Sequence, residues 1–273
     1  MVKASIIVSV YKKIHDLELI LTALKVQSFK DFEVIIADDG SGEKMHKFVH
    51  DFIKNSPYKL SFITQNDDGF RKNKILNTAI IKSSTPYLIF TDGDCIPHFD
   101  FMKHHYENRH KNTVLCGKRV NLSRKLSLEI TKAGLIEKQF QKVRLRHFYD
   151  SFLNKKDRTT FAEHGIVVEN KFIRKMFEPG EPHIVGCNFS LNKELIEKIN
   201  GFDENYIGPG IGEDSDIEFR LRLINAKFRS LKNLAILFHL YHRKTKEENQ
   251  NNFYFDEVKK RRNPVCRNGI IKY

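Results

Sequence analysis

Short, uninterrupted runs of apolar residues alternate along the first part of the chain with segments whose apolar residues recur at helical spacing. Residues 4–10 form a run of the first kind, rich in β-branched side chains, which is typical of a strand buried on both faces of a parallel sheet. The same patterns predict strands at residues 32–37, 60–63 and 87–90, and helices at residues 17–26, 43–54 and 72–82. Strands that alternate with helices predict an α/β fold with a mostly parallel, doubly wound, Rossmann-like sheet flanked by helices.

The second part of the chain departs from this alternation. Residues 119–180 are rich in lysine and arginine, poor in strand signals and mostly helical in pattern between Leu126 and Phe152. Beyond them, the pattern predicts helices at residues 193–199 and 216–225 and a strand at residues 234–238. The last part of the chain is charged and contains a basic run at residues 259–262.

Composition narrows the class of protein. Lysine and arginine number 47 against 34 aspartate and glutamate, so the formal net charge is +13. Such an excess favours anionic partners, namely nucleic acid, anionic lipid or phosphorylated small molecules, although a solvated basic surface is the other explanation.

Cysteine usage and hydropathy bear on the location of the protein. The four cysteines lie far apart and form no CxxC pair, which indicates free thiols in a reducing compartment. No apolar run approaches the roughly 20 residues of a membrane-spanning helix. The first residues lead directly into a strand, so we expect no secretion signal and a cytoplasmic protein.

Acidic residues follow two of the predicted strands directly. Asp38 and Asp39 come after the second strand, and Asp92-Gly93-Asp94 comes after the fourth. In parallel sheets ligands bind beyond the carboxyl ends of the strands. Two aspartates one residue apart could hold Mg²⁺ or Mn²⁺ together with substrate phosphates, although an Asp-Gly turn explains the same residues, and Asp214-x-Asp216 has the same spacing. Asp38-Asp39-Gly40-Ser41 is likewise either a turn or a nucleoside contact.

Two further groups carry candidate chemistry. Glu213-Asp214 ends a glycine-rich loop, residues 208–212, where a carboxylate could act as a general base. The alternative is that these residues form the acidic first turn of the next helix. The helix dipole favours an acidic residue there, but it explains one such residue better than the three at 213, 214 and 216. His239 and His242 follow the last predicted strand, and imidazole beside carboxylates suits Mn²⁺ better than Mg²⁺.

Taken together, these segments resemble the inverting family 2 glycosyltransferases with the GT-A fold. The resemblance covers residues 3–104 and 183–242, and its order and spacing are more specific than any single motif. The second of these ranges, residues 183–242, is similar to the galactosyltransferase-type C-terminal region shared with chondroitin-type polymerases. The matching segments are Ser5 to Tyr11, Gln27 to Phe29, Asp31 to Ser41, Gly69 to Arg71, Asn77 to Ala79, Thr91 to Asp94, Gly186 to Ser190, Gly201 to Glu204 and Gly212 to Asp214.

The resemblance implies one domain with two functional halves and a tail. We expect the GT-A glycosyltransferase domain at residues 1–242, with its nucleotide-binding half at residues 1–104. A helical, basic, acceptor-side segment is expected at residues 105–182 and an acceptor and catalytic half at residues 183–242. Residues 243–273 are expected to form a charged C-terminal tail.

The resemblance also implies how a nucleotide-sugar is bound. Asp39 is expected to contact the uracil, Asp38 the nucleoside nearby, and Arg71 the phosphates. The nucleotide-sugar-binding residues are expected to be Ser9, Tyr11, Asp38, Asp39, Arg71, Asn77, Asp92, Gly93 and Asn188.

For the metal and the reaction, the resemblance implies a second set of roles. Asp94 and His239 are expected to ligate Mn²⁺ or Mg²⁺, with Asp92 and His242 as further candidate ligands. Asp214 is the expected catalytic base and Glu213 is expected to bind sugar hydroxyls. The base removes the acceptor proton while the nucleoside diphosphate leaves from the opposite face, so one displacement inverts the anomeric configuration.

One departure from the relatives affects specificity. They carry a tryptophan in the loop before Glu-Asp, whereas this chain has none, so their donor and acceptor preferences do not carry over. UDP-Gal, UDP-GalNAc and UDP-GlcNAc are the expected candidate donors, with a glycan or lipid-linked acceptor in surface polysaccharide synthesis. The basic segment 119–180 is expected to receive a charged polysaccharide or to contact an anionic membrane at its inner face.

Two other functions are weaker. A sugar-phosphate nucleotidyltransferase should carry a glycine-rich loop after its first strand, and residues 11–15 contain no glycine. A basic nucleic-acid-binding protein should show a recognisable binding module, and none appears. We therefore expect no nucleic-acid partner.

Overall fold

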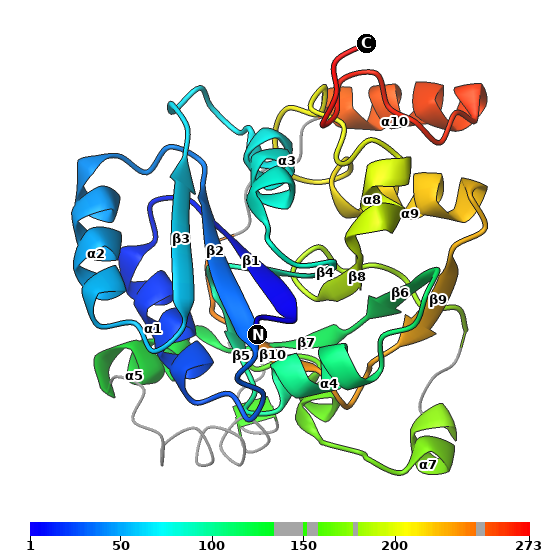
Figure 1. Cartoon of the computed structure of the whole chain (residues 1–273). Coiled ribbons are helices and arrows are strands. Elements are labelled where there is room, and N and C mark those ends of the chain that lie inside the picture. Colours follow the sequence, from blue (N-terminus) through cyan, green and yellow to red (C-terminus); the bar gives the residue numbers. More distant parts are fainter. Residues whose placement is uncertain (134–149, 152–157, 177–179, 244–248) are drawn as a thin grey trace.

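The computed structural model of the chain describes residues 1–133, 150–151, 158–176, 180–243 and 249–273. Within them, a seven-stranded sheet has the strand order β3-β2-β1-β4-β8-β6-β9 (Figure 1). β1 to β4 run parallel, β8 is antiparallel to β4 and β6, and β9 is parallel to β6. Its strands are β1 (Ala4–Val10), β2 (Phe32–Asp38), β3 (Lys59–Thr64), β4 (Tyr87–Asp92), β6 (Thr113–Cys116), β8 (Phe189–Asn192) and β9 (Lys227–Ser230).

A smaller sheet adjoins the first and carries the metal-type residues. It contains β5 (Cys95–Pro97), β7 (Lys118–Asn121) and β10 (Ile236–His239), with β10 in the middle. His239 lies opposite Cys95 on one side and Asn121 on the other. This pairing brings the end of β10 against the turn that follows β4.

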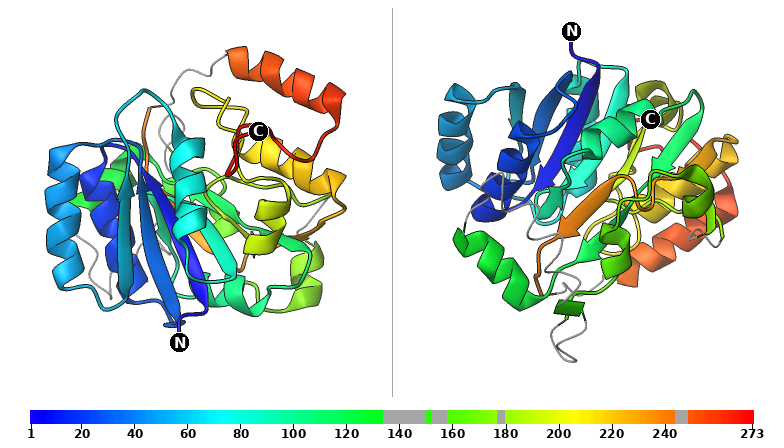
Figure 2. Two further views of the ribbon diagram at one scale, coloured as in Figure 1. Left: turned by 45° about the horizontal axis from the view of Figure 1, so that its top comes forward. Right: turned by 90° about the horizontal axis from the view of Figure 1, so that it is seen from below.

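Helices cover both faces of the large sheet (Figure 2). The side chains of β1 divide between two apolar clusters: Ile6 and Val8 pack on the face of α1 and α2, and Ile7 packs on the face of α3, α8 and α9. This two-sided burial explains the uninterrupted apolar run in the sequence. The helices are α1 (Ile14–Lys25), α2 (Glu43–Lys54), α3 (Lys72–Lys82), α4 (Phe101–Glu107), α5 (Arg124–Ala133), the short 3₁₀ helix η1 (Ala162–Gly165), α7 (Lys171–Met176), α8 (Lys193–Lys198), α9 (Asp214–Leu223) and α10 (Asn249–Arg261).

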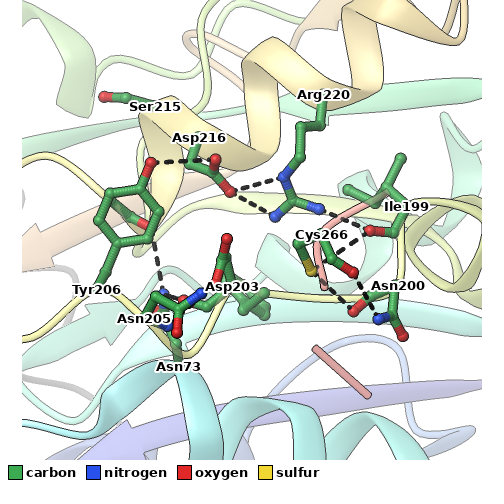
Figure 3. Close-up of polar contacts among 12 residues, drawn as sticks. Asn73, Ile199, Asn200, Asp203, Asn205, Tyr206, Ser215, Asp216, Arg220 and Cys266 are labelled. Atoms are coloured by element: carbon green, nitrogen blue, oxygen red, sulfur yellow. Dashed lines mark hydrogen bonds and ion pairs between the residues drawn. The ribbon is translucent and has the colours of Figure 1, made fainter. Parts of the chain in front are cut away.

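The C-terminal residues pack against the domain. α10 lies along α9 (Figure 1). The Phe255 ring of α10 meets the Phe219 ring of α9 edge to face, with 6.1 Å between the centroids. After α10 the chain returns to the end of α8, where Asn200 Nδ2 donates to the Cys266 carbonyl at 2.8 Å (Figure 3). The sequence analysis treated residues 243–273 only as a charged tail and did not predict this packing.

The predicted α/β fold with a mostly parallel central sheet is confirmed, and the strands and helices of its first part lie within a few residues of their predicted bounds. β5, β6, β7, β8 and β9 were not predicted, because strands of three or four residues are too short to show a period. The helix predicted from Leu126 to Phe152 is seen as α5, and residues 134–149 and 152 of that prediction lie outside the described residues. None of the described residues belongs to a helix that is long and apolar enough to cross a membrane.

Glu33 on β2 provides a test of the fold, because it is a buried carboxylate with several donors. Its side chain accepts hydrogen bonds from Ser5 Oγ and from the backbone and side chain of Ser84, each at 2.7 Å, and Lys59 Nζ lies at 2.6 Å. Burial by itself would raise the pKa of Glu33, but these donors outweigh it and hold the pKa at about 2, below the ordinary 4.5. Because the pKa of Glu33 is lower in the folded chain than in the unfolded chain, ionised Glu33 stabilises the fold at pH values above about 4.5. This stabilisation is lost as the pH falls from about 4.5 toward 2.

We predict that Glu33→Gln lowers the free energy of unfolding by about 2–3 kcal/mol at pH 7. The difference from the parent chain should shrink between about pH 5 and pH 3, as Glu33 loses its advantage in the parent. Urea denaturation at several pH values measures it, with the exposed Glu107→Gln as the control. A difference that stays constant with pH would show that the carboxylate charge does not stabilise the fold.

Candidate active site

A cavity of about 1020 Å³ opens at the carboxyl ends of β1, β2 and β4. The strand register explains its position, because Val10 lies opposite Asp38 and Ser9 lies opposite Asp92. The ends of three neighbouring parallel strands therefore meet at one edge of the sheet. The predicted site residues that line the cavity are Ser9, Tyr11, Asp39, Asp92, Gly93, Asp94, Glu213, His239 and His242.

Asp94 lies at the centre of a cluster of nitrogen donors. Lys13 Nζ is 2.7 Å from Asp94 Oδ2, and the Nε2 atoms of His239 and His242 are 3.6 Å and 3.5 Å from the two carboxylate oxygens. Burial would raise the pKa of Asp94, but His239 and Lys13 outweigh it and hold the pKa at about 2. Burial also lowers the pKa of His239 to about 4 against the opposing effect of Asp94, so this imidazole is neutral at pH 7.

The same cluster fits a divalent metal by its donor set. Asp94, His239 and His242 each offer one ligand atom, and these atoms lie within 4.8 Å of one another. One carboxylate oxygen with two imidazole nitrogens is a set that Mn²⁺ accepts. The Lys13 ammonium already balances the Asp94 charge at this point.

A second group, Asp92 with Cys95 and Cys187, also brings metal-type atoms within 4.8 Å. However, Arg119 Nη1 lies 3.5 Å from Cys187 Sγ, so a guanidinium charge already faces these atoms. We assign no metal to this group. Asp92 accepts hydrogen bonds instead, from Ser9 Oγ and from Lys72 Nζ, each at 2.7 Å.

Lys72 joins the two acidic motifs. Its Nζ lies 2.7 Å from Asp92 Oδ1 and 2.9 Å from the Glu213 carboxylate, and its side chain is 15% exposed. Burial opposes the charged ammonium, yet Asp92 and Glu213 outweigh it and raise the pKa of Lys72. Burial raises the pKa of Glu213, and the attraction of Lys72 only partly offsets this effect.

The sequence analysis missed Lys72, although a signal was present. The residue lies three positions before Ile75 and four before Leu76, on the face of α3 that is buried. A lysine on the apolar face of a helix requires a carboxylate partner. Arg71, which was predicted to approach the phosphates, does not line the cavity: its backbone N–H donates to Asp39, and its Nε lies 3.4 Å from the exposed Asp68.

The two aspartates after β2 have different roles. Asp39 lines the cavity and accepts hydrogen bonds from the Arg71 backbone N–H at 2.9 Å and from Gln65 Nε2 at 2.5 Å; burial raises its pKa. Asp38 is fully buried and accepts from the Ser41 N–H at 3.0 Å and from Thr64 Oγ1 at 2.8 Å. Asp38 therefore holds the turn in this structure, and its contact with the nucleoside stays a prediction.

Two predicted asparagines also bind the chain itself. Asn77 Nδ2 donates to the Phe202 carbonyl, and its Oδ1 accepts from the Phe202 N–H, both at 2.8 Å. Asn188 Nδ2 donates to the carbonyls of Lys118 and Ala235. Both asparagines are at most 2% exposed, so their amides position neighbouring segments and have no free atom for a nucleotide-sugar.

Gly93 lies between the two aspartates because a side chain has no room there. Its N–H donates to the Ser9 carbonyl at 2.7 Å, and a Cβ atom would lie 3.0 Å from that oxygen and from Val10. Asp92 and Asp94 are thereby held against the end of β1, one toward Lys72 and the other toward His239.

Glu213 and Asp214 begin α9, at the end of the glycine-rich loop. Asp214 accepts from the Gly186 N–H at 3.2 Å and from the Ser215 N–H at 2.8 Å, and it lines a small recess beside Ser9, Lys72 and Glu213. Glu213 alone of the pair also lines the main cavity. In this structure Glu213 thus lies closer to a ligand in the cavity than Asp214 does.

A buried polar network fixes this loop from behind (Figure 3). Arg220 donates two hydrogen bonds to Asp216, with Nε at 2.8 Å from Oδ2, and Tyr206 OH donates to the same carboxylate at 3.2 Å. Asn73 Nδ2, one residue after Lys72, donates to the carbonyls of Asp203 and Gly212. Asp216, whose spacing to Asp214 imitates a metal motif, is thus a structural ion-pair partner.

Comparison with known proteins gives matches to two families over most of the chain. Residues 5–199 match the family described as "Glycosyl transferase family 2", and residues 171–243 match "N-terminal domain of galactosyltransferase". The chain is 25% identical over 241 residues to a chondroitin synthase of Escherichia coli, covering 86% of this chain and 34% of that protein. It is 31% identical over 92 residues to a teichoic acid poly(glycerol phosphate) polymerase of Staphylococcus epidermidis, covering 34% and 13% of the two chains.

Solved structures share the fold at low sequence identity. The mannosyltransferase PcManGT of Pyrobaculum calidifontis, solved with GDP-Man and Mn²⁺, has a TM-score of 0.59 at 15% identity, over 89% of this chain and 58% of that one. Residues 1–349 of S. aureus TarS, solved with UDP-GlcNAc, give 0.55 at 17% identity, over 90% and 60%. The predicted GT-A fold is confirmed. The chain spans about a third of the chondroitin synthase and about three-fifths of these structures.

We predict that Lys72→Met lowers the free energy of unfolding by about 2 kcal/mol, because Asp92 and Glu213 are then buried without their shared cation. The double variant Lys72→Met, Glu213→Gln should regain part of this loss, since it removes one of the two unpaired charges. Urea denaturation at pH 7 measures both. Lys74→Met, an exposed lysine on the same helix, is the matched control. Equal losses in Lys72→Met and Lys74→Met would contradict the bridging role.

Proposed function

Because the chain belongs to glycosyltransferase family 2, we propose that it transfers a sugar from a UDP-sugar to a hydroxyl of a glycan or lipid-linked acceptor, in a metal-dependent and inverting reaction. One observation carries the proposal: a single cavity holds Asp92 and the Asp94 cluster at the end of β4 together with Glu213 at the start of α9, and Lys72 joins Glu213 to Asp92. A donor beside the first group places its sugar next to the second.

On the donor side, the proposal uses the side chains at the ends of β1 and β2. The Asp39 carboxylate lies at the cavity wall and can accept a hydrogen bond from the single N–H group of a uracil base, N3–H. The Tyr11 ring is 43% exposed at the same wall, with its OH bonded to Asp67 at 3.1 Å, and offers a face for stacking. Ser9 orients Asp92 toward the ribose.

For the metal, the proposal uses Asp94 and His239, with His242 as a third ligand and Asp92 next to them. A bound Mn²⁺ or Mg²⁺ supplies positive charge that stabilises the departing diphosphate. Lys13 then releases Asp94 and remains near the phosphates, where its ammonium adds to the same stabilisation.

For the transfer, Asp214 is proposed as the base and Glu213 as the residue that binds sugar hydroxyls. The acceptor oxygen forms a bond to the anomeric carbon as the bond from that carbon to the diphosphate breaks, and the acceptor proton passes to a carboxylate oxygen of Asp214. Lys72 holds Glu213 in the cavity wall, and the N–H groups of Gly186 and Ser215 orient Asp214.

The named relatives suggest the donors and the setting. UDP-GlcNAc and GDP-Man are the nucleotide-sugars in the two similar structures, and chondroitin and teichoic acid are polymers made by the two similar proteins. UDP-Gal, UDP-GalNAc and UDP-GlcNAc are therefore the first donors to test, with a role in surface polysaccharide synthesis at the cytoplasmic face of a membrane. No nucleic-acid partner is proposed.

Acceptor-free hydrolysis of a UDP-sugar tests the function. We predict that one of the three UDP-sugars is hydrolysed in the presence of Mn²⁺ and that EDTA abolishes the reaction. Asp94→Ala should weaken Mn²⁺-dependent UDP binding, measured by calorimetry, by roughly tenfold or more, because it removes the central ligand. UDP with Mn²⁺ that neither binds nor raises the melting temperature, while nucleic acid does, would refute the proposal.

The assignment of the base is tested by a pair of variants. We predict that Asp214→Asn retains UDP and Mn²⁺ binding but lowers kcat for transfer by at least about 100-fold, the usual contribution of a positioned base. Glu213→Gln should act more on the KM for the donor, since Glu213 is expected to bind the sugar. If Asp214→Asn turned over at a rate similar to the parent while Glu213→Gln did not, Glu213 would be the base.

A further inference from the structure

The cavity has a second wall, on the side of the three-stranded sheet, which the proposed donor site does not use. We call it the arginine wall and define it by Arg119, Arg158 and Arg243, all of which line the cavity. The chain fixes it at several points. Asn121 on β7 exchanges two backbone hydrogen bonds with Thr160, and the Tyr241 N–H donates to Ser127 Oγ on α5.

The arginine wall carries charge that the described part of the chain does not balance. Among the described residues, no carboxylate forms an ion pair with any of these three arginines, and Arg119 instead donates to the sulfur of Cys187. Arg220 and Arg222, by contrast, are paired with Asp216 and Glu218. Three of the four carboxylates of the cavity already have a cationic partner, because Lys13 contacts Asp94 and Lys72 contacts both Asp92 and Glu213.

The charge balance of the whole cavity gives the same result. Its lining contains five lysines and arginines and four carboxylates, so one positive charge remains. A divalent cation and the doubly ionised diphosphate of a UDP-sugar cancel each other, and they leave this surplus unchanged. An uncompensated charge in a partly enclosed site is unfavourable, so a further anion is expected to complete it.

The volume allows a second ligand beside the donor. Pockets for one small ligand typically measure about 300–1,000 Å³, and this cavity measures about 1020 Å³. A nucleotide-sugar on the walls of β1, β2 and β4, with its metal at the end of β10, leaves the side of β7 and the three arginines open. That side adjoins Glu213 and the glycine-rich loop, which line the same cavity through Glu213, Pro209 and Gly210.

We propose that the arginine wall binds an anionic group of the acceptor, a carboxylate or a phosphate, close to the hydroxyl that receives the sugar. This inference rests on the proposed function and names its acceptor class. Guanidinium groups form paired hydrogen bonds with carboxylate and phosphate oxygens, so they fix the orientation of the anion as well as attracting it. The anion thereby holds the acceptor chain in one register, with a single hydroxyl toward the start of α9.

Three acceptor probes test the class. With the donor identified by hydrolysis, UDP release is measured with a glucuronic acid-terminated oligosaccharide, a glycerol phosphate oligomer and a neutral N-acetyllactosamine oligosaccharide of similar size. We expect one anionic probe to accelerate UDP release above the acceptor-free rate and the neutral probe not to do so. Which anionic probe is active distinguishes carboxylate from phosphate. Acceleration by the neutral probe alone, or by none of the three, would overturn the inference.

Arginine variants test the site. Arg158→Gln and Arg243→Gln should each raise the KM for the active anionic probe by about tenfold, the value of one lost charge-assisted hydrogen bond, and should raise the donor KM much less. Arg267→Gln, an exposed arginine that does not line the cavity, is the charge-matched control and should change neither value. A rise in the donor KM with no rise in the acceptor KM would assign these arginines to the diphosphate and overturn the inference.

The proposed function and the acceptor class can fail separately. If UDP with Mn²⁺ does not bind, the proposed function fails together with the inference. If the UDP-sugar is hydrolysed but the anionic probes show no advantage over the neutral one, the acceptor class alone is wrong.

Discussion

The arrangement of this site depends on one buried ammonium group. Lys72 Nζ contacts Asp92, at the end of β4, and Glu213, at the start of α9, and these residues lie more than a hundred positions apart in the chain. Without the cation, two half-buried carboxylates would repel each other across the cavity. Lys72 therefore connects the first half of the fold with the half that contains the expected base, and it does so where a donor sugar would lie.

The elements around Lys72 are fixed accordingly. The side chain of the next residue, Asn73, donates to the Gly212 carbonyl. The first turn of α3 therefore holds the glycine-rich loop by a hydrogen bond to its backbone as well as by the ion pair of Lys72 with Glu213. One helical turn later, Asn77 binds Phe202 in both directions. Arg220 and Asp216 close the network from the side of α9. The glycine-rich loop thus enters the cavity from a rigid support, which a site needs if its groups are to keep their positions.

The sequence predicted where the candidate site residues lie in the fold better than it predicted which groups they contact. Acidic residues after apolar strands were correctly located, because register alone brings the ends of parallel strands together. Asp38, Asn77 and Asn188 were assigned to the ligand, since a buried polar residue that holds a turn and one that binds a nucleotide have the same sequence pattern. Lys72 and Arg119 were missed because their partners, Glu213 and Cys187, are distant in sequence and only the folded chain brings them together.

The two kinds of cation in the cavity suit different tasks. Lys13 contacts the Asp94 carboxylate, and a flexible ammonium can exchange such a contact for a phosphate when a ligand enters. Arg158 and Arg243, by contrast, have rigid guanidinium groups without an acidic partner among the described residues. A group that must move during the reaction is better built from lysine, and a group that must hold one orientation is better built from arginine. The division between lysines at the donor and arginines on the opposite wall follows this distinction, and it gives part of the net charge of +13 a specific place and use.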